Sequence, residues 1–527
     1  MLRAARDNHI RDSTGRLPQT PAGSAPCASC SGKSPTSPYY YLWTIREPQR
    51  KLSSGLESGG PRLHPSPVSA APPITRGLLF VFALPGILQG FMHAPAQSIL
   101  QGIYAKESGL ALVALGGAVL LVRVCDIATD LLIGYFSDRS AERGISRKWW
   151  MAAGTAVTIV SLWFLFRPPP QVSIGYYGGW FLLANIGWSL CEIPYRSWSL
   201  EFSPEARQRT RITTWIAMAT MVGSVLFYVV GPAGKAMGVL KSGELNMEML
   251  GLTAVLVALL LPLLNFYALW KVPDGQSRAA SGHRPPPESI RLLLASVLGN
   301  VPLMRLILVF SVCNLMSGLS GSVSLLYMTN YLGLGAEANL VLALALPIAM
   351  LGLPLWGWLA QRYPLQRVWA VGLGMAGVAY TGLGLLPPHP GTLLYGLVGT
   401  LVVFFALSTL IAAPVILGDI IDYGKEHYGV DRAGLYVSCQ TQVVKAVNAL
   451  AAGGGLIFLG WMGFDATKSG ADITPQALLA LKLTAAWAPA LGMISAGLML
   501  WFLPISAESR KLAAARSPSP VPGVEVT

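Results

Sequence analysis

Twelve long apolar runs follow one another between residues 76 and 504, and they constrain the fold more than any other feature. A helix needs about 20 residues to cross a bilayer, and most of these runs reach that length. Only 12% of the 527 residues are charged, whereas soluble domains carry about 25%. We therefore expect an all-α membrane protein with twelve transmembrane helices. The expected spans are 76–99, 110–135, 149–166, 174–200, 212–232, 248–270, 302–328, 337–360, 367–386, 392–417, 434–461 and 478–504.

Polar segments divide the apolar runs into two halves of six. A linker at 271–301 separates an N-terminal half, 76–270, from a C-terminal half, 302–504. Residues 1–75 and 505–527 lack hydrophobic periodicity, and we expect them to be disordered. Lys and Arg gather in alternate loops, which predicts a multi-pass protein with both termini in the cytoplasm. From the composition we expect a bacterial inner membrane, with surrounding lipid. We expect no nucleic-acid partner, because the net charge of +13 follows this loop bias.

Signatures of enzymes and metal sites are missing from the sequence. It contains no G-x-S-x-G elbow, no H-E-x-x-H pair and no phosphate-binding loop. Cys27 and Cys30 form a CASC motif without a second pair of ligands, so no metal site is expected. We expect a monomeric transporter of a small molecule, without enzymatic activity and without a cofactor.

Two acids and one lysine stand out among the charges inside the apolar runs. Asp126 and Asp130 are one helical turn apart, and Lys445 lies in the eleventh run. A charge at membrane depth costs about 2.5–3.5 kcal/mol on insertion scales, so it marks an ion or substrate path. Residues i and i+4 share a helix face, so both carboxylates can bind one cation, either Na⁺ or H⁺. Two structural alternatives remain: an ion pair of Asp126 with Arg123, and neutralisation of Asp130 by Lys445.

The two halves carry related loops after their second runs, a layout typical of rocker-type secondary transporters. The loop Gly134-x-x-x-Asp138-Arg139, followed by Arg147 and Lys148, resembles the signature loop of the major facilitator superfamily. More narrowly, the chain resembles the glycoside–pentoside–hexuronide:cation symporters, the melibiose-carrier group. That resemblance covers about residues 76–504 and is carried by D-x-x-x-D at 126–130, IPY at 193–195, GDIIDYG at 418–424 and QVVK at 442–445. Eukaryotic lysolipid symporters share much of this pattern.

The resemblance implies roles for individual residues. Asp126, Asp130 and Glu192 would bind the coupling cation, with Lys445 near the cation site. We expect Lys445 and Arg123 to act as charge-coupling groups. The inner gate would be formed by Asp138, Arg139, Asp419 and Asp422.

Residues around Glu192 and in the first run are the candidates for substrate binding. Arg196 follows Glu192 by one turn, and either forms an intrahelical pair with it or recognises an anionic group. Tyr195 and Trp198 could stack on a sugar ring, although aromatic residues at this spacing are more often packing residues. Gln89 and His93 are polar residues of the first run. The expected function is cation-coupled symport of a sugar, glycoside or uronide; a lysolipid or other amphiphilic anion, or an uncoupled facilitator, is the alternative.

Overall fold

The computed structural model describes residues 75–94, 99–202, 206–274, 296–428, 432–468 and 472–505. The predictions for 1–74, for most of the linker (275–295) and for 506–527 lie outside these residues, as does the CASC motif. The described chain is helical throughout and contains no strand. The all-α prediction is therefore confirmed.

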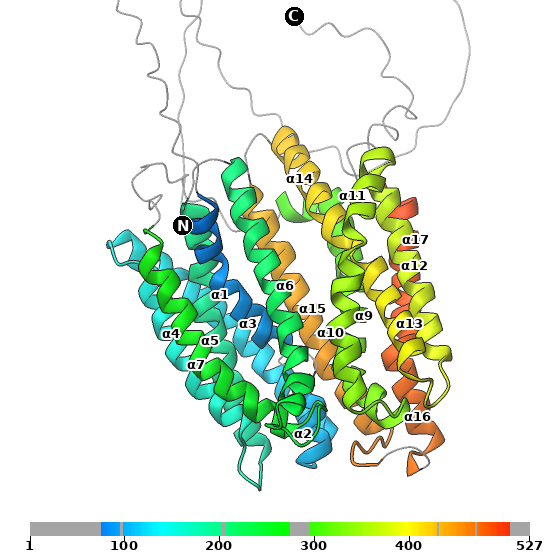
Figure 1. Ribbon diagram of the computed structural model, residues 1–527. Coiled ribbons are helices and arrows are strands. Elements are labelled where there is room, and N and C mark those ends of the chain that lie inside the picture. Colours follow the sequence, from blue (N-terminus) through cyan, green and yellow to red (C-terminus); the bar gives the residue numbers. More distant parts are fainter. Residues whose placement is uncertain are drawn as a thin grey trace, which may run out of the picture. The chain divides into compact units, whose positions relative to one another are not determined.

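Seven helices of the N-terminal half lie in the described part of the chain, and α1 and α2 belong together to the first of its six spans (Figure 1). Asn246 and Ser173 cap two of these helices, since their side chains accept hydrogen bonds from Met249 N at 2.9 Å and Tyr176 N at 3.1 Å. The elements are α1 (Arg76–Ala94), α2 (Leu100–Glu107), α3 (Leu112–Glu142), α4 (Lys148–Phe166), α5 (Ile174–Glu201), α6 (Ala206–Ala236) and α7 (Met247–Lys271).

The C-terminal half contributes the other six spans, several of which are interrupted. Asn300 caps its first helix by accepting a hydrogen bond from Leu303 N at 3.1 Å, and Pro302 stands in the first turn, where no intrahelical N–H is needed. The elements are α9 (Val301–Leu326), the π-helix η3 (Tyr327–Tyr331), α10 (Ala336–Met350), α11 (Leu353–Arg362), α12 (Leu365–Leu385), α13 (Thr392–Ala406), α14 (Ser408–Tyr428), α15 (Ala433–Trp461), α16 (Pro475–Lys482), the π-helix η5 (Leu483–Trp487) and α17 (Ala488–Phe502).

Ten helical segments of the described chain are long and apolar enough to cross a membrane. The span α1–α2 and the more polar α5 complete the twelve. The protein is thus a multi-pass membrane protein of the predicted architecture.

The two halves touch each other mainly through α3 with α15 and α6 with α10, and through a smaller contact of α2 with α9. At the first crossing, a Cβ added to Gly116 would lie 2.5 Å from the carbonyl oxygen of Gly453, so only glycine fits there. At the second crossing, Asn339 donates its amide N–H to the Gly243 carbonyl at 2.5 Å. The Gly116–Gly453 crossing, the Asn339–Gly243 contact and the α2–α9 contact lie toward the end that carries the α2–α3 and α15–α16 loops, at the bottom of Figure 1, which we call the closed end.

We predict that replacing Gly453 with leucine separates the halves at the closed end. The new side chain would meet Leu120 and the Gly116 backbone, and overpacking of this kind costs about 1–3 kcal/mol. Thermal unfolding in detergent should shift to lower temperature. A cysteine placed at the buried position Gln101 of α2 should also react faster with a membrane-impermeant maleimide.

Gly454 provides the matched control, because a Cβ added there meets nothing within 4 Å. Gly454→Leu should leave both measurements unchanged. Equal effects of the two substitutions would show that the close crossing does not hold the end shut.

Candidate functional site

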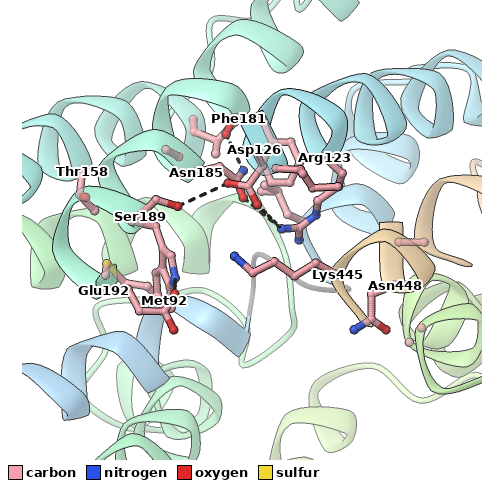
Figure 2. A pocket seen from close by; sticks show the side chains of 18 of the residues that line it. Met92, Arg123, Asp126, Thr158, Phe181, Asn185, Ser189, Glu192, Lys445 and Asn448 are labelled. Carbon is pink, nitrogen blue, oxygen red and sulfur yellow. Dashed lines mark hydrogen bonds and ion pairs between the residues drawn. The ribbon is translucent and has the colours of Figure 1, made fainter. Parts of the chain in front are cut away.

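A cavity of about 490 Å³ lies between the two halves (Figure 2). Its N-terminal wall comes from α1 to α5, and its C-terminal wall from α9 and α15. The lining residues are Met92, Leu100, Arg123, Asp126, Ile127, Thr158, Leu162, Leu165, Phe166, Phe181, Ala184, Asn185, Trp188, Ser189, Glu192, Arg196, Asn314, Ser317, Gly318, Gly321, Lys445, Asn448 and Ala452.

Helix α5 presents one continuous stripe to the cavity. Phe181, Asn185, Trp188, Glu192 and Arg196 follow at spacings of three or four residues, which place them on one helix face. Trp188 donates its indole N–H to Glu192 Oε2 at 2.7 Å, and the Arg196 guanidinium meets Glu192 Oε1 at 2.6 Å. The intrahelical pair expected for Arg196 is therefore present. Its side chain is still 74% exposed and belongs to the cavity lining.

Helix α3 brings the first acid of the predicted pair into the cavity. Arg123 Nη1 lies 3.7 Å from Asp126 Oδ2 and donates a hydrogen bond to Asn185 Oδ1 at 3.2 Å. Ser189 donates its hydroxyl to Asp126 Oδ1 at 3.5 Å. Asp126 is thus held by a cation on its own helix and by a hydroxyl on α5, as Figure 2 shows. This is the ion pair that sequence analysis kept as an alternative.

The second acid joins the two halves. Asp130, whose side chain is 5% exposed, forms an ion pair through Oδ2 with Lys445 of α15. Its other oxygen, Oδ1, is buried without a hydrogen-bond partner in the described part of the chain. A buried carboxylate oxygen without a donor is costly. The neutralisation of Asp130 expected as an alternative is therefore present, and one oxygen is left over for a further ligand.

The aromatic and amide candidates near the substrate side lie elsewhere. Tyr195 is buried and donates its hydroxyl to the Phe82 carbonyl at 2.6 Å, and Trp198 packs on the Phe82 ring with centroids 4.8 Å apart. Neither lines the cavity, so their geometry favours packing between α1 and α5. Gln89 lies beside a small void of about 10 Å³ behind the cavity. The side chain of His93 lies outside the described residues.

The residues predicted to gate the transporter lie at the ends of α3 and α14. Asp138 pairs with Arg147 at 2.8 Å, and Arg139 with Glu142 at 3.5 Å, so these ion pairs stay within the N-terminal half. Asp419 is half-buried and Asp422 exposed on α14. Their gating role stays a prediction.

Several lining residues were missed by sequence reasoning. Ser189, Asn185 and Thr158 line the N-terminal wall, and Asn314 and Asn448 the C-terminal wall. The first two could have been found by counting three and seven residues back from Glu192 along the same helix face. The two asparagines of the C-terminal half carry no comparable signal, because an uncharged amide does not stand out in an apolar run.

Comparison with known proteins places the chain in a family. The family model described as MFS/sugar transport protein matches residues 81–507. The "Glucuronide carrier protein homolog" of Escherichia coli (strain K12) is 23% identical over 440 residues, which cover 81% of this chain and 92% of that protein. "Major facilitator superfamily domain-containing protein 12" of Mus musculus is 27% identical over 147 residues, covering 26% of this chain and 28% of that protein.

Solved structures agree on the fold. The inward-open xylose transporter XylE from E. coli aligns with a TM-score of 0.56 and 16% identity, covering 83% of this chain and 99% of that one. The nucleoside transporter NupG aligns with a TM-score of 0.55 and 12% identity, covering 81% of this chain and 100% of that one. The family model spans most of the described chain, and both family and fold are those of transporters and not of enzymes. The protein therefore belongs to the MFS/sugar transport protein family of the major facilitator superfamily.

Proposed function

We propose that the protein is a cation-coupled symporter of a sugar, glycoside or uronide, and that a uronide fits best. The observation that carries the proposal is the ion pair of Asp130 with Lys445 between the two halves, with Asp126 one turn away on α3. This arrangement ties the charge state of a two-carboxylate site to a contact between the halves.

A cation would act on this contact by competition. Na⁺ favours several hard oxygen ligands, as other hard cations do, and a proton needs one carboxylate oxygen. Asp126, Asp130 and the nearby Ser189 hydroxyl supply such oxygens, including the buried Asp130 Oδ1. A cation bound to Asp130 neutralises its carboxylate in place of Lys445. Lys445 and α15 are then free to shift relative to α3.

Substrate binding and cation binding are linked through the same cavity. Lys445 and Asp126 both line it, so a substrate in the cavity lies beside the cation site. By thermodynamic linkage, the substrate tightens cation binding by the factor by which the cation tightens substrate binding. Rocking of the two halves about the cavity then carries both across the membrane.

The charge balance of the site favours an acidic substrate. The cations Arg123, Arg196 and Lys445 are matched by the carboxylates of Asp126, Asp130 and Glu192. A bound monovalent cation adds one positive charge, and a net charge at membrane depth is expensive. A substrate with one carboxylate restores neutrality, and the exposed Arg196 fork is suited to bind it. The similarity to a glucuronide carrier homolog supports the same class.

An amphiphilic anion is the second candidate. Helix α4 contributes an apolar wall of Leu162, Leu165 and Phe166 next to the charged stripe of α5. Such a wall would accept the apolar aglycone of a glycoside or a short acyl chain. Uptake assays with both ligand classes separate these cases.

We predict that Asp126→Asn and Asp130→Asn abolish concentrative uptake. Each removes a cation ligand, so accumulation of 4-nitrophenyl β-D-glucuronide in proteoliposomes should fall at least about tenfold, equivalent to 1.4 kcal/mol of lost coupling. Separate Na⁺ and pH gradients identify the cation. Asp465→Asn, in the exposed α15–α16 loop, is the control and should transport normally. Normal accumulation by both site variants, or uptake that ignores every gradient, would contradict the symport mechanism.

A double-mutant cycle separates coupling from simple charge neutralisation. Lys445→Gln leaves the Asp130 carboxylate buried without its partner, so thermal unfolding should shift to lower temperature. Adding Asp130→Asn should reverse most of this shift toward the wild-type unfolding temperature. The interaction energy between the two positions should then be about 0.5–3 kcal/mol. If the pair couples transport, the stable double variant remains unable to concentrate substrate. Normal concentration by that variant would make the pair purely structural.

We predict that Arg196→Gln discriminates between acidic and neutral ligands. Binding of 4-nitrophenyl β-D-glucuronide should weaken about tenfold, while the glucoside, which has CH₂OH in place of the carboxylate, binds as before. Arg362→Gln on α11, outside the cavity lining, is the matched control. Binding is measured by titration calorimetry. Equal loss for both ligands would show that Arg196 supports the site only through Glu192.

A further inference from the structure

The two walls of the cavity differ in chemistry. The N-terminal wall holds Arg123, Asp126, Glu192 and Arg196, together with aromatic rings. The C-terminal wall holds one charge, Lys445, and otherwise its polar side chains are uncharged. These are Asn314, Ser317 and Asn448. A ligand that fills this cavity therefore meets charged groups on one side and neutral hydrogen-bonding groups on the other.

The two asparagines form a pair between α9 and α15. Asn448 Nδ2 lies 3.4 Å from Asn314 Oδ1, a long hydrogen bond. Asn314 donates its own amide to the Phe310 carbonyl at 2.8 Å, one turn earlier on α9, which fixes its orientation. Gly318 leaves room for the neighbouring carboxamide, because an added Cβ would lie 3.2 Å from Asn448 Oδ1. Both asparagines are half-buried and line the cavity.

The unused groups of this pair match hydroxyls. Each carboxamide has two N–H donors and one oxygen with two lone pairs, and the bonds above use only part of that capacity. The pair therefore offers donors and acceptors side by side. A hydroxyl both donates and accepts, whereas a carboxylate only accepts. Two adjacent amides fit the neighbouring hydroxyls of a sugar ring better than they fit an anionic group.

We infer that Asn314 and Asn448 bind ring hydroxyls of the substrate, so that the C-terminal half selects the neutral sugar ring and the N-terminal half selects the charged group. This inference rests on the proposed transport of a sugar derivative. Asn448 follows Lys445 by three residues on the same face of α15, and Figure 2 shows the two on one helix. A sugar bound to Asn448 thus lies one turn from the group that pairs with the cation site.

The test compares amide removal with hydroxyl removal. Purified full-length protein is titrated with 4-nitrophenyl β-D-glucuronide and with its 2-, 3- and 4-deoxy analogues. Asn448→Ala and Asn314→Ala should each weaken binding of the parent ligand about tenfold. The wild-type protein should bind one of the deoxy analogues about tenfold more weakly than the parent ligand. The alanine variant should bind that analogue and the parent ligand with equal affinity, because the same hydrogen bond is missing already. Gln476→Ala, at an exposed amide on α16, should bind every ligand as the wild type does.

Thermal unfolding and gradient-driven uptake keep the outcomes distinct. Asn448→Ser keeps a small polar group, and its thermal unfolding shows whether weaker binding comes from a damaged fold. Unchanged affinity for all ligands in the alanine variants would overturn the inference while leaving symport intact. If the effects of the alanine substitution and of hydroxyl removal are non-additive as expected, but no gradient drives uptake, symport alone would be overturned. Failure of the wild type to bind any uronide or glycoside would overturn both.

Discussion

The ion pair between Asp130 and Lys445 is the interaction on which the rest of the site depends. Each charge alone would be costly inside an apolar bundle, and neither half of the protein contains both. The pair forms where α3 packs on α15, and the same two helices cross closely at Gly116 and Gly453 toward the closed end. Folding, the contact between the halves and the charge state of the carboxylates are thereby joined in one place.

The two halves differ in how their charges are paired, because an unpaired charge inside the apolar bundle is costly. The N-terminal wall can hold several charges because each is matched locally, Asp126 by Arg123 and Glu192 by Arg196 on their own helices. The charge contributed to the cavity by the C-terminal half is Lys445, whose partner lies across the interface. The intrahelical pairs can move as rigid parts of one half. The pair across the interface must change if the halves move apart, and for that reason the proposed coupling is assigned to it.

Hydropathy predicted the spans well because it measures the property that a bilayer selects. The expected range 174–200 corresponds to Ile174–Glu201, and 434–461 to Ala433–Trp461. It failed where a helix continues past the apolar run: α14 extends to Tyr428, past the expected end at 417, and α3 extends to Glu142, past 135. It also missed the interruption within 337–360, where α10 ends at Met350 and α11 begins at Leu353 ahead of Pro354. Whether a helix continues without interruption depends on local backbone geometry, which the mean hydropathy of a segment does not measure.

Within the site, the charged residues could be predicted from the sequence, and the neutral polar residues could not. Asp126, Asp130 and Lys445 could be identified because a charge in an apolar run is energetically costly. Asn314 and Asn448 are uncharged, and only the packing of α9 against α15 shows that they lie side by side. Tyr195 and Trp198 are near Glu192 in sequence, but both pack against Phe82 instead. Trp198 lies about 120° around the helix from Glu192 at 3.6 residues per turn. Tyr195 is three residues from Glu192, as the cavity-lining Ser189 is, so spacing alone does not separate the two. A charge in an apolar run can therefore be recognised from the sequence alone. A neutral polar group becomes a candidate only when the packed helices show which side chains of other helices lie beside it.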